Sequence, residues 1–321
     1  MDVIKPLIQV FEKHLSEHPL TREPFNLYQP ADYILSLGGK RLRPVFVLMG
    51  YDFYKKDIER SLNAAMAVEI FHNFTLLHDD IMDKAPLRRG MQTVHTKYGE
   101  NTALLAGDVM LVKAYEYLSR IDGDFLKPIM HLFNQTAREV CEGQQWDMDY
   151  EKQESVHLDE YLRMIELKTS VLLAASLKMG AILGGSGERN QNLLYEFGRK
   201  LGIAFQVQDD YLDAFGDPEK FGKQVGGDIL ANKKTFLLIH ALETANAEQL
   251  EELKQLIAGN PADKVEQVLR IFRDCKVDEW AIELKNKYLD EAFQHLDDIA
   301  VLSKRKQPLT DLARFLVQRE H

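Results

Sequence analysis

Two short clusters of aspartates carry the clearest chemical signal in this 321-residue sequence. Residues 79–83 read Asp-Asp-Ile-Met-Asp, and residues 209–213 read Asp-Asp-Tyr-Leu-Asp. Each cluster ends a stretch in which apolar residues recur every three or four positions, a pattern that predicts a helix. Because residues four apart share a helix face, the outer carboxylates of each cluster would repel one another unless cations neutralised them.

A hard divalent cation suits carboxylate clusters of this kind. Mg²⁺ takes oxygen ligands, keeps several waters and often shares its coordination with substrate phosphates. A single cluster would more often be a solvated helix end, but two of them on apolar helices favour metal and diphosphate binding. The pattern needs no histidine or cysteine ligand, which disfavours zinc.

Basic residues lie beside both acidic clusters. Gly38 and Gly39 precede Lys40 and Arg43 at the expected start of a helix, where backbone N–H groups and the helix dipole favour anions. Adjacent arginines follow the first cluster at 88 and 89, and a Gly- and Lys-rich segment, 216–234, follows the second. Neighbouring arginines can point to opposite sides and so serve two anions. The sequence therefore predicts binding of phosphate groups beside each cluster.

Composition narrows the class of protein. Hydrophobic residues make up 45% of the chain and charged residues 28%, which is typical of a globular protein. The net charge of −10 argues against an overall basic nucleic-acid binder. Two cysteines are too few for a disulfide scaffold, the N-terminus lacks a signal-peptide pattern, and apolar runs are too short for a membrane span. We expect a cytoplasmic protein.

The elements that position these residues are predicted to be helices. Alternating β-type runs are nearly absent, and no Ser- or Pro-rich linker divides the chain. The periodicity predicts helices over 63–83, 101–119, 127–142, 158–183, 190–215, 235–243, 247–258, 263–274 and 278–302. We predict one all-α domain over residues 1–321, a large bundle in which two central helices are largely buried.

The ordered motifs resemble those of the trans-type isoprenyl diphosphate synthases, also called polyprenyl synthetases. The likeness covers nearly the whole chain. Beyond the aspartate clusters it includes Gly-Gly-Lys-Arg-x-Arg-Pro at 38–44, Arg-Arg-Gly at 88–90, Lys-Thr at 168–169, Phe-Gln-x-Gln at 205–208, Gly-Lys at 222–223 and Gly-Gly-Asp at 226–228.

The resemblance implies an all-α homodimer of the isoprenoid synthase type, with a deep central cavity in each subunit. It implies head-to-tail condensation of isopentenyl diphosphate with an allylic diphosphate (dimethylallyl, geranyl or farnesyl), and three Mg²⁺ ions per active site. No nucleic-acid partner and no integral membrane segment are expected.

The resemblance also assigns roles to individual residues. The metal ligands would be Asp79, Asp83 and Asp209, with Asp80, Asp210 and Asp213 as supporting ligands. Isopentenyl diphosphate would be held by Lys40, Arg43, His72 and Arg89. The allylic substrate would be held by Arg88, Lys168, Gln206, Lys223 and Lys233. Thr169 would face the developing cation, so the residues placed closest to the chemistry are Lys168, Thr169, Gln206 and Lys223.

Product length is predicted from the residues before the first cluster. In the resembled family, bulk four and five positions before the first aspartate sets the cavity floor. Phe74 with the smaller Thr75 resembles the pattern that forms C20, geranylgeranyl diphosphate, and Phe71 is a further candidate for the floor. On an ideal helix Thr75 lies under Asp79 while Phe74 is rotated away, so Phe74 could equally be a core residue. A C15 (farnesyl) or longer product stays open.

Three other classes of protein fit less of the sequence. A terpene cyclase would share the fold and the first cluster but typically carries a different second motif. A His-Asp metal phosphohydrolase is suggested by His72 and the His78-Asp79 pair but leaves the second cluster unexplained. A non-catalytic subunit of a heteromeric prenyl synthase is opposed by the intact acidic motifs.

Overall fold

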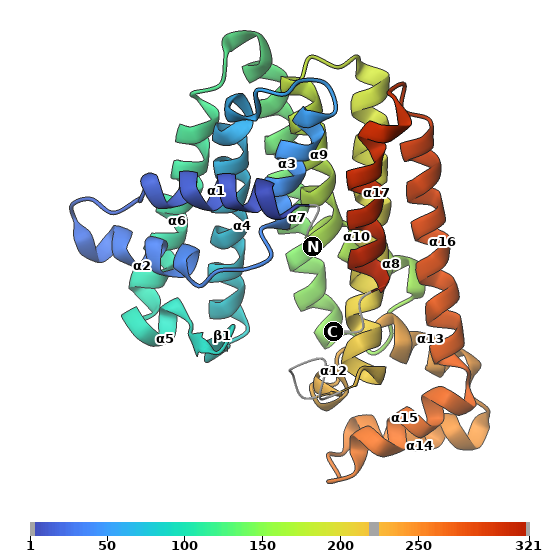
Figure 1. Cartoon of the computed structure of the whole chain (residues 1–321). Coiled ribbons are helices and arrows are strands. Elements are labelled where there is room, and N and C mark those ends of the chain that lie inside the picture. The colour runs from blue at the N-terminus through green and yellow to red at the C-terminus, as the bar shows by residue number, and fades with distance from the viewer. Residues whose placement is uncertain (1–3, 218–224, 319–321) are drawn as a thin grey trace. The chain divides into compact units, whose positions relative to one another are not determined.

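Helices dominate the computed structural model, which describes residues 4–217 and 225–318 (Figure 1). Within these ranges the strands are β1 (Leu87–Arg88) and β2 (Met91–Gln92), an antiparallel pair. The all-α prediction is confirmed. The helices are α1 (Lys5–Glu17), α2 (Phe25–Ser36), α3 (Leu42–Asp52), η1 (Ile58–Ser61), α4 (Leu62–Met82), α5 (Val94–Tyr98), α6 (Glu100–Leu118), α7 (Gly123–Lys152), α8 (Leu158–Ile165), η2 (Glu166–Ser170), α9 (Val171–Leu183), α10 (Glu188–Phe215), α12 (Gly227–Leu230), α13 (Phe236–Thr244), α14 (Ala247–Ala258), α15 (Lys264–Asp274), α16 (Val277–Asp297) and α17 (Ser303–Gln318).

The described residues divide into two compact units. Unit 1 contains the residues up to Asn134, with Ala175–Leu194 and Val301–Pro308. Unit 2 contains Gln135–Ala174, Tyr195–Ala300 and the residues from Leu309 onward. The helices α7, α9, α10 and α17 each include residues of both units. The single domain over 1–321 stays a prediction.

Unit 1 is built around α4, whose first half is buried on all sides. Ala64–Ile70 consists almost entirely of apolar residues with no exposed surface, which is why this helix can only lie inside. α6 runs beside α4, and α1 and α2 pass across the pair (Figure 1). α4 therefore carries the first aspartate cluster from the core to the end of the unit.

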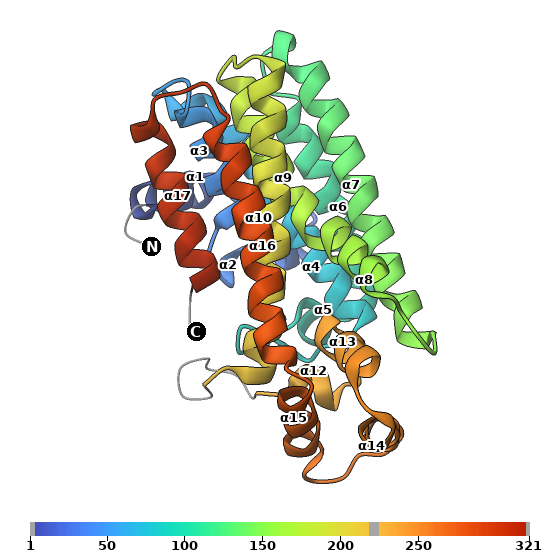
Figure 2. The same ribbon diagram turned by 90° about the vertical axis from the view of Figure 1, so that its right-hand side faces the viewer.

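Unit 2 has a separate apolar core in which α13, α15 and α16 meet. Phe236, Phe272 and Leu253 are buried there together with Ile203 and Val207 of α10. The helices α13, α14 and α15 gather near one end of α16 (Figure 2). The two faces of α10 thus divide between this core and the second aspartate cluster.

The predicted helix over 158–183 is wrong in one respect. The structure interrupts it with η2, a five-residue π-helical turn, between α8 and α9. Gly143 on α7 lies so close that a Cβ atom there would come 2.4 Å from the Lys168 backbone nitrogen. An extra residue in a helix leaves the apolar pattern on both sides intact, so periodicity does not reveal it. α7 also extends beyond the predicted 127–142, because its polar last turns show no apolar pattern.

None of the helices in the described part of the chain has the length and hydropathy that a membrane span requires.

Candidate functional site

The first aspartate cluster lies at the C-terminal end of α4. Asp83 caps the helix, and its backbone N–H donates to the Asp79 carbonyl oxygen at 2.8 Å. Asp79 is half-buried and Asp83 is exposed, whereas Asp80 is buried. Carboxylates at 79 and 83 are therefore placed one helical turn apart at the end of unit 1, and Asp80 points into the unit.

Asp80 is held by an arginine of the hairpin that follows. Arg88 Nε donates to Asp80 Oδ2 at 2.8 Å, and Arg88 Nη2 donates to Oδ1 at 2.7 Å. This two-point contact has the planar geometry that arginine makes best with carboxylates. The buried carboxylate thus fixes the guanidinium beside the first cluster, and its predicted role as a supporting metal ligand stays a prediction.

The next arginine points to a different partner. Arg89 and Gly90 occupy the turn between β1 and β2 with positive φ angles of 55° and 76°, as in a tight two-residue hairpin. Arg89 Nη1 donates to the Gly38 carbonyl oxygen. Its guanidinium lies against Gly39, where a Cβ would come 2.8 Å from Arg89 Nη2. The adjacent arginines therefore contact separate groups, and their assignment to two different anions stays a prediction.

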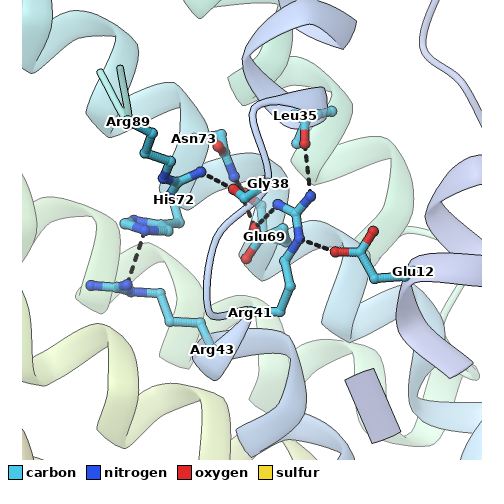
Figure 3. Close-up of polar contacts among 9 residues, drawn as sticks. All are labelled: Glu12, Leu35, Gly38, Arg41, Arg43, Glu69, His72, Asn73 and Arg89. Carbon is cyan, nitrogen blue, oxygen red and sulfur yellow. Dashed lines mark hydrogen bonds and ion pairs between the residues drawn. The ribbon is translucent and has the colours of Figure 1, made fainter. Parts of the chain in front are cut away.

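Arg43 and His72 form the centre of a cationic cluster in unit 1 (Figure 3). Arg43 Nη1 donates to His72 Nε2 at 2.9 Å. Burial, followed by the charges of Arg43 and Arg89, lowers the pKa of His72 well below its usual value, so the ring is neutral. Burial and Arg89 lower the pKa of Arg43 to about 10, which leaves it charged at neutral pH. Lys40 is exposed on the same loop.

The second aspartate cluster has neutral hydrogen-bond donors in place of arginine. Asp210 is buried, and it accepts hydrogen bonds from Tyr161 Oη and, at 2.9 Å, from Gln206 Nε2. Burial, with a contribution from Asp228, raises the pKa of Asp210 to about 7. Asp213 Oδ2 accepts from the Asp228 backbone N–H at 2.9 Å. Asp209 and Asp213 are both half-buried.

A cavity of about 160 Å³ opens beside Asp210 within unit 2. Lys168 pairs with Asp147 at 2.6 Å, and Lys233 pairs with Asp228 at 3.0 Å. Burial opposes the charge of Lys233, but Asp228 outweighs it and raises the pKa of this lysine. The lining consists mainly of polar and charged residues: Asp147, Tyr150, Glu151, Tyr161, Met164, Ile165, Lys168, Thr169, Gln206, Asp210, Asp228, Lys233, Lys234 and Thr235.

Four predicted substrate residues therefore meet in this cavity, namely Lys168, Thr169, Gln206 and Lys233. The π-turn explains how Lys168 and Thr169 reach it, because π-turns rotate successive side chains and occur frequently at functional sites. Lys223 lies outside the described residues.

The donor set fits Mg²⁺. In the described ranges, no group of three or more His, Cys, Asp or Glu side chains is assembled to hold a metal by itself. Each cluster instead offers half-buried or exposed carboxylates one turn apart. Mg²⁺ is usually bound by one or two carboxylates together with substrate phosphates, so an incomplete protein shell suits it.

The predicted chain-length residues lie on α4. Phe71 is buried and packs against Phe133 at a ring distance of 5.1 Å. Phe74 stacks edge-on with His78 at 4.7 Å, and the Thr75 hydroxyl donates to the His72 carbonyl oxygen at 2.8 Å. Both rings thus have packing partners in unit 1, and their influence on product length stays a prediction.

Several residues of these two regions escaped the sequence analysis. Arg41 stands inside the quoted motif at 38–44, yet nothing in its spacing distinguishes it from its basic neighbours. Tyr161 and Asp147 are far from Asp210 in sequence and reach it only through the fold. Glu69 is a buried acid in an otherwise apolar stretch of α4, and that mismatch was a signal the sequence offered.

Comparisons with known proteins agree with this geometry. A family model described as Polyprenyl synthetase matches residues 24–275. The geranylgeranyl diphosphate synthase of Methanosarcina mazei is 38% identical over 94% of this chain and 92% of its own. The short chain isoprenyl diphosphate synthase of Methanocaldococcus jannaschii is 41% identical over 91% and 89%. A crystal structure titled geranylgeranyl pyrophosphate synthase superposes with a TM-score of 0.95 and 44% identity, covering 100% of both chains. With its aspartate clusters and basic loops in the order that the resemblance demanded, the chain belongs to the polyprenyl synthetase family.

Proposed function

We propose that this chain is an isoprenyl diphosphate synthase that condenses isopentenyl diphosphate with an allylic diphosphate and forms geranylgeranyl diphosphate, C20. The proposal rests on one observation: the chain contains a cationic cluster in unit 1 and a cavity beside a buried aspartate in unit 2. Unit 1 contains the cations Arg43 and Arg89 around a neutral His72, and unit 2 contains a cavity lined by Asp210 and Lys168. The names of the relatives support the C20 product.

Isopentenyl diphosphate is assigned to the cationic cluster of unit 1. Its diphosphate would be held by Lys40, Arg43, His72 and Arg89. Arginine binds phosphate oxygens through two parallel donors, and a neutral His72 can donate one further hydrogen bond. Because the protein itself supplies this positive charge, binding here needs no metal.

The allylic diphosphate is assigned to the acidic clusters. Asp79, Asp83 and Asp209 would hold Mg²⁺, three ions per active site, with Asp80, Asp210 and Asp213 supporting them. When bound, Mg²⁺ stabilises the negative charge of the diphosphate leaving group. Arg88, Lys168, Gln206, Lys223 and Lys233 would bind the same diphosphate, and Thr169 would face the allylic carbon.

The reaction follows from the chemistry of these substrates. The allylic C–O bond breaks, the electron pair leaves with diphosphate, and Lys168 and Lys233 help to stabilise that charge. The alkene of isopentenyl diphosphate attacks the allylic cation, and a proton is lost to the departing diphosphate. No side-chain base is required. Apolar residues of α4 and α10 would keep water from the cation.

We also propose a homodimer in the cytoplasm. On α6, Leu105 and Val112 are 58% and 55% exposed and lie seven residues apart, hence on one face. Leu104 is 49% exposed beside them. A second copy of the chain would bury this apolar stripe. Sedimentation equilibrium should give twice the chain mass, and Leu105→Glu should shift it toward the monomer.

A terpene cyclase or a non-catalytic subunit is less well supported. The complete second cluster and the cationic cluster of unit 1 provide for two diphosphates, which a cyclase does not need. Incubating the purified chain with isopentenyl diphosphate and each primer, and sizing the products by mass spectrometry, tests the proposal. Geranylgeranyl diphosphate from the lone chain supports it. The proposal is contradicted if the purified chain does not extend any of the primers to a longer prenyl diphosphate.

A further inference from the structure

Arg41 has an unusual backbone conformation at the start of α3. It is the N-cap residue, with φ 48° and ψ 33°, in the left-handed region. A residue with a Cβ atom is disfavoured there and persists only when its surroundings fix it. Gly38 and Gly39 also have positive φ angles of 77° and 138°. The turn that carries Lys40 and Arg43 is thus held in a conformation that its own sequence does not favour at residue 41.

Three hydrogen bonds from the Arg41 guanidinium fix this turn (Figure 3). Nε donates to Glu12 of α1 at 2.6 Å and Nη1 donates to Glu69 of α4 at 2.6 Å. Nη2 donates to the Leu35 carbonyl oxygen of α2 at 2.7 Å. The Arg41 side chain is 2% exposed. One guanidinium therefore ties the turn to three helices, and lysine could not reproduce this forked geometry.

Glu69 is the second part of this arrangement. Its side chain is 5% exposed, and Asn73 Nδ2 also donates to it at 3.1 Å. Glu69 acts electrostatically on Arg43 and Arg89 as well as on Arg41, since it opposes the lowering of the pKa of both. A buried carboxylate without its partner attracts any cation within reach. In this structure Arg41 forms an ion pair with Glu69.

The Nε–H group of Arg43 is a buried hydrogen-bond donor that no neighbouring residue in the described part of the chain accepts. Buried donors are almost always paired in folded proteins, so this one is suited to a ligand acceptor. If Arg41 no longer paired with Glu69, this carboxylate, which already acts electrostatically on Arg43, would compete with a ligand for that donor.

We propose that Arg41 is a positioning residue for the anion site of unit 1: it holds the Gly38–Arg43 turn in position for a diphosphate, and by pairing with Glu69 it keeps that carboxylate from competing for Arg43. The inference rests on the proposed function for the identity of that diphosphate, isopentenyl diphosphate. Arg41 itself is buried behind the turn and touches no substrate.

Three variants separate these contributions. Arg41→Met removes the fork and releases Glu69. Arg41→Met/Glu69→Gln removes the fork and the released charge together. Arg60→Met is the matched control. The Arg60 side chain is 67% exposed, and it forms a surface ion pair with Asp57. Thermal melting establishes that each variant is folded. The readouts are the KM for each substrate and the Kd of isopentenyl diphosphate by titration calorimetry in EDTA.

We expect Arg41→Met to raise the KM and Kd for isopentenyl diphosphate about tenfold or more, because Arg43, drawn toward the released Glu69, would lose one charge-assisted contact with the diphosphate. The KM for farnesyl diphosphate should stay within about twofold, because that substrate is assigned to the acidic clusters. The double variant should recover part of the loss, since Arg43 is no longer drawn to Glu69. If Arg41→Met alone does not fold, the Kd of isopentenyl diphosphate is compared between the double variant and Arg41→Lys, which keeps the positive charge but loses the forked geometry.

Unchanged binding of isopentenyl diphosphate in folded Arg41→Met overturns the proposal. A double variant as weak as the single variant also overturns it, because the released charge would then play no part. Weakened binding in Arg41→Met, found with a wild-type chain that turns over no primer, would support the positioning role and contradict the proposed function. The two failures are therefore distinguishable.

Discussion

In unit 1 the buried carboxylates of Glu69 and Asp80 are each paired with an arginine, whereas in unit 2 the buried carboxylate of Asp210 is held by two neutral donors. Burial raises the pKa of Asp210 to about 7, as expected for a carboxyl group without a paired arginine. Two lysines of the unit 2 cavity are in turn paired with carboxylates: Lys168 with Asp147, and Lys233 with Asp228.

This difference indicates two ways to bind the same chemical group. Around Arg43 and Arg89 the protein supplies several positive charges, so under the proposed function a diphosphate would bind there directly. Around Asp210 acidic groups accumulate, so under the proposed function a diphosphate would be attracted only after cations have bound. The following predictions change individual residues of these two regions, each with its own control or comparison.

The largest effect is expected from the outer aspartates. Asp79→Asn and Asp209→Asn should each lower turnover by roughly 10² to 10⁴, because each removes a Mg²⁺ ligand that stabilises the leaving group. Turnover at limiting Mg²⁺ is the measurement. Asp298→Asn, at an exposed position after α16, is the control and should be normal. Near-normal turnover in both cluster variants would contradict the metal assignment.

The adjacent arginines should separate the two substrates. Arg88→Ala should mainly raise the KM of the allylic diphosphate and Arg89→Ala that of isopentenyl diphosphate, each by roughly 10- to 100-fold for a lost contact of about 1.5–3 kcal/mol. Arg88→Ala also leaves Asp80 buried without its arginine, so its melting temperature should fall, and Arg88→Ala/Asp80→Asn should restore part of it. Equal effects on both substrates from each variant would remove the two-site assignment.

A change of one isoprene unit is expected at Thr75. A helical turn spans about 5.4 Å, close to the length of one added unit, and Thr75 lies one turn before Asp79. Thr75→Phe should therefore convert a C20 product mostly to C15. Phe71→Ala should lengthen the product if its ring forms the floor, at a cost of about 3–5 kcal/mol in stability because it is packed against Phe133. An unchanged product from folded Thr75→Phe would place the length determinant on another helix.

The smallest effect concerns stability in acid. The pKa of His72 is lower in the folded chain than in the unfolded chain, so below about pH 6.5 the unfolded chain binds an extra proton. The free energy of unfolding should therefore fall by up to about 1.4 kcal/mol per pH unit. Denaturant unfolding of wild type and His72→Asn at pH 7.5 and 5.5 should show the wild type losing its advantage. The control is His131→Asn, because His131 is exposed. If the difference in free energy of unfolding between wild type and His72→Asn is the same at both pH values, the neutral state of His72 is contradicted.

The sequence predicted the helices that carry a strong apolar period and missed features that depend on contacts between helices. α4 was predicted as 63–83 and spans Leu62–Met82, because an unbroken apolar stretch admits no other element. The π-turn in 166–170 was missed because no local pattern marks it; it packs closely against Gly143, which lies on another helix. The hairpin that carries Arg88 and Arg89 was not predicted, since each of its strands has only two residues.

The site was predictable where motifs bring chemistry together and unpredictable where the fold does. The aspartates and Lys168 follow from spacing and resemblance. Tyr161 and Asp147 depend on the packing of α7, α8 and α10, which no local pattern specifies. Arg41 was visible in its motif, but its role depends on Glu12, Glu69 and Leu35 from three other helices.

The most direct test of the two modes of diphosphate binding is calorimetric titration with and without metal. Isopentenyl diphosphate and farnesyl diphosphate would each be titrated into the wild-type chain in EDTA and again in Mg²⁺. We predict that isopentenyl diphosphate binds with similar Kd in both conditions, whereas farnesyl diphosphate binds tightly only with Mg²⁺. Metal-dependent binding of isopentenyl diphosphate, or tight binding of farnesyl diphosphate in EDTA, would contradict the account.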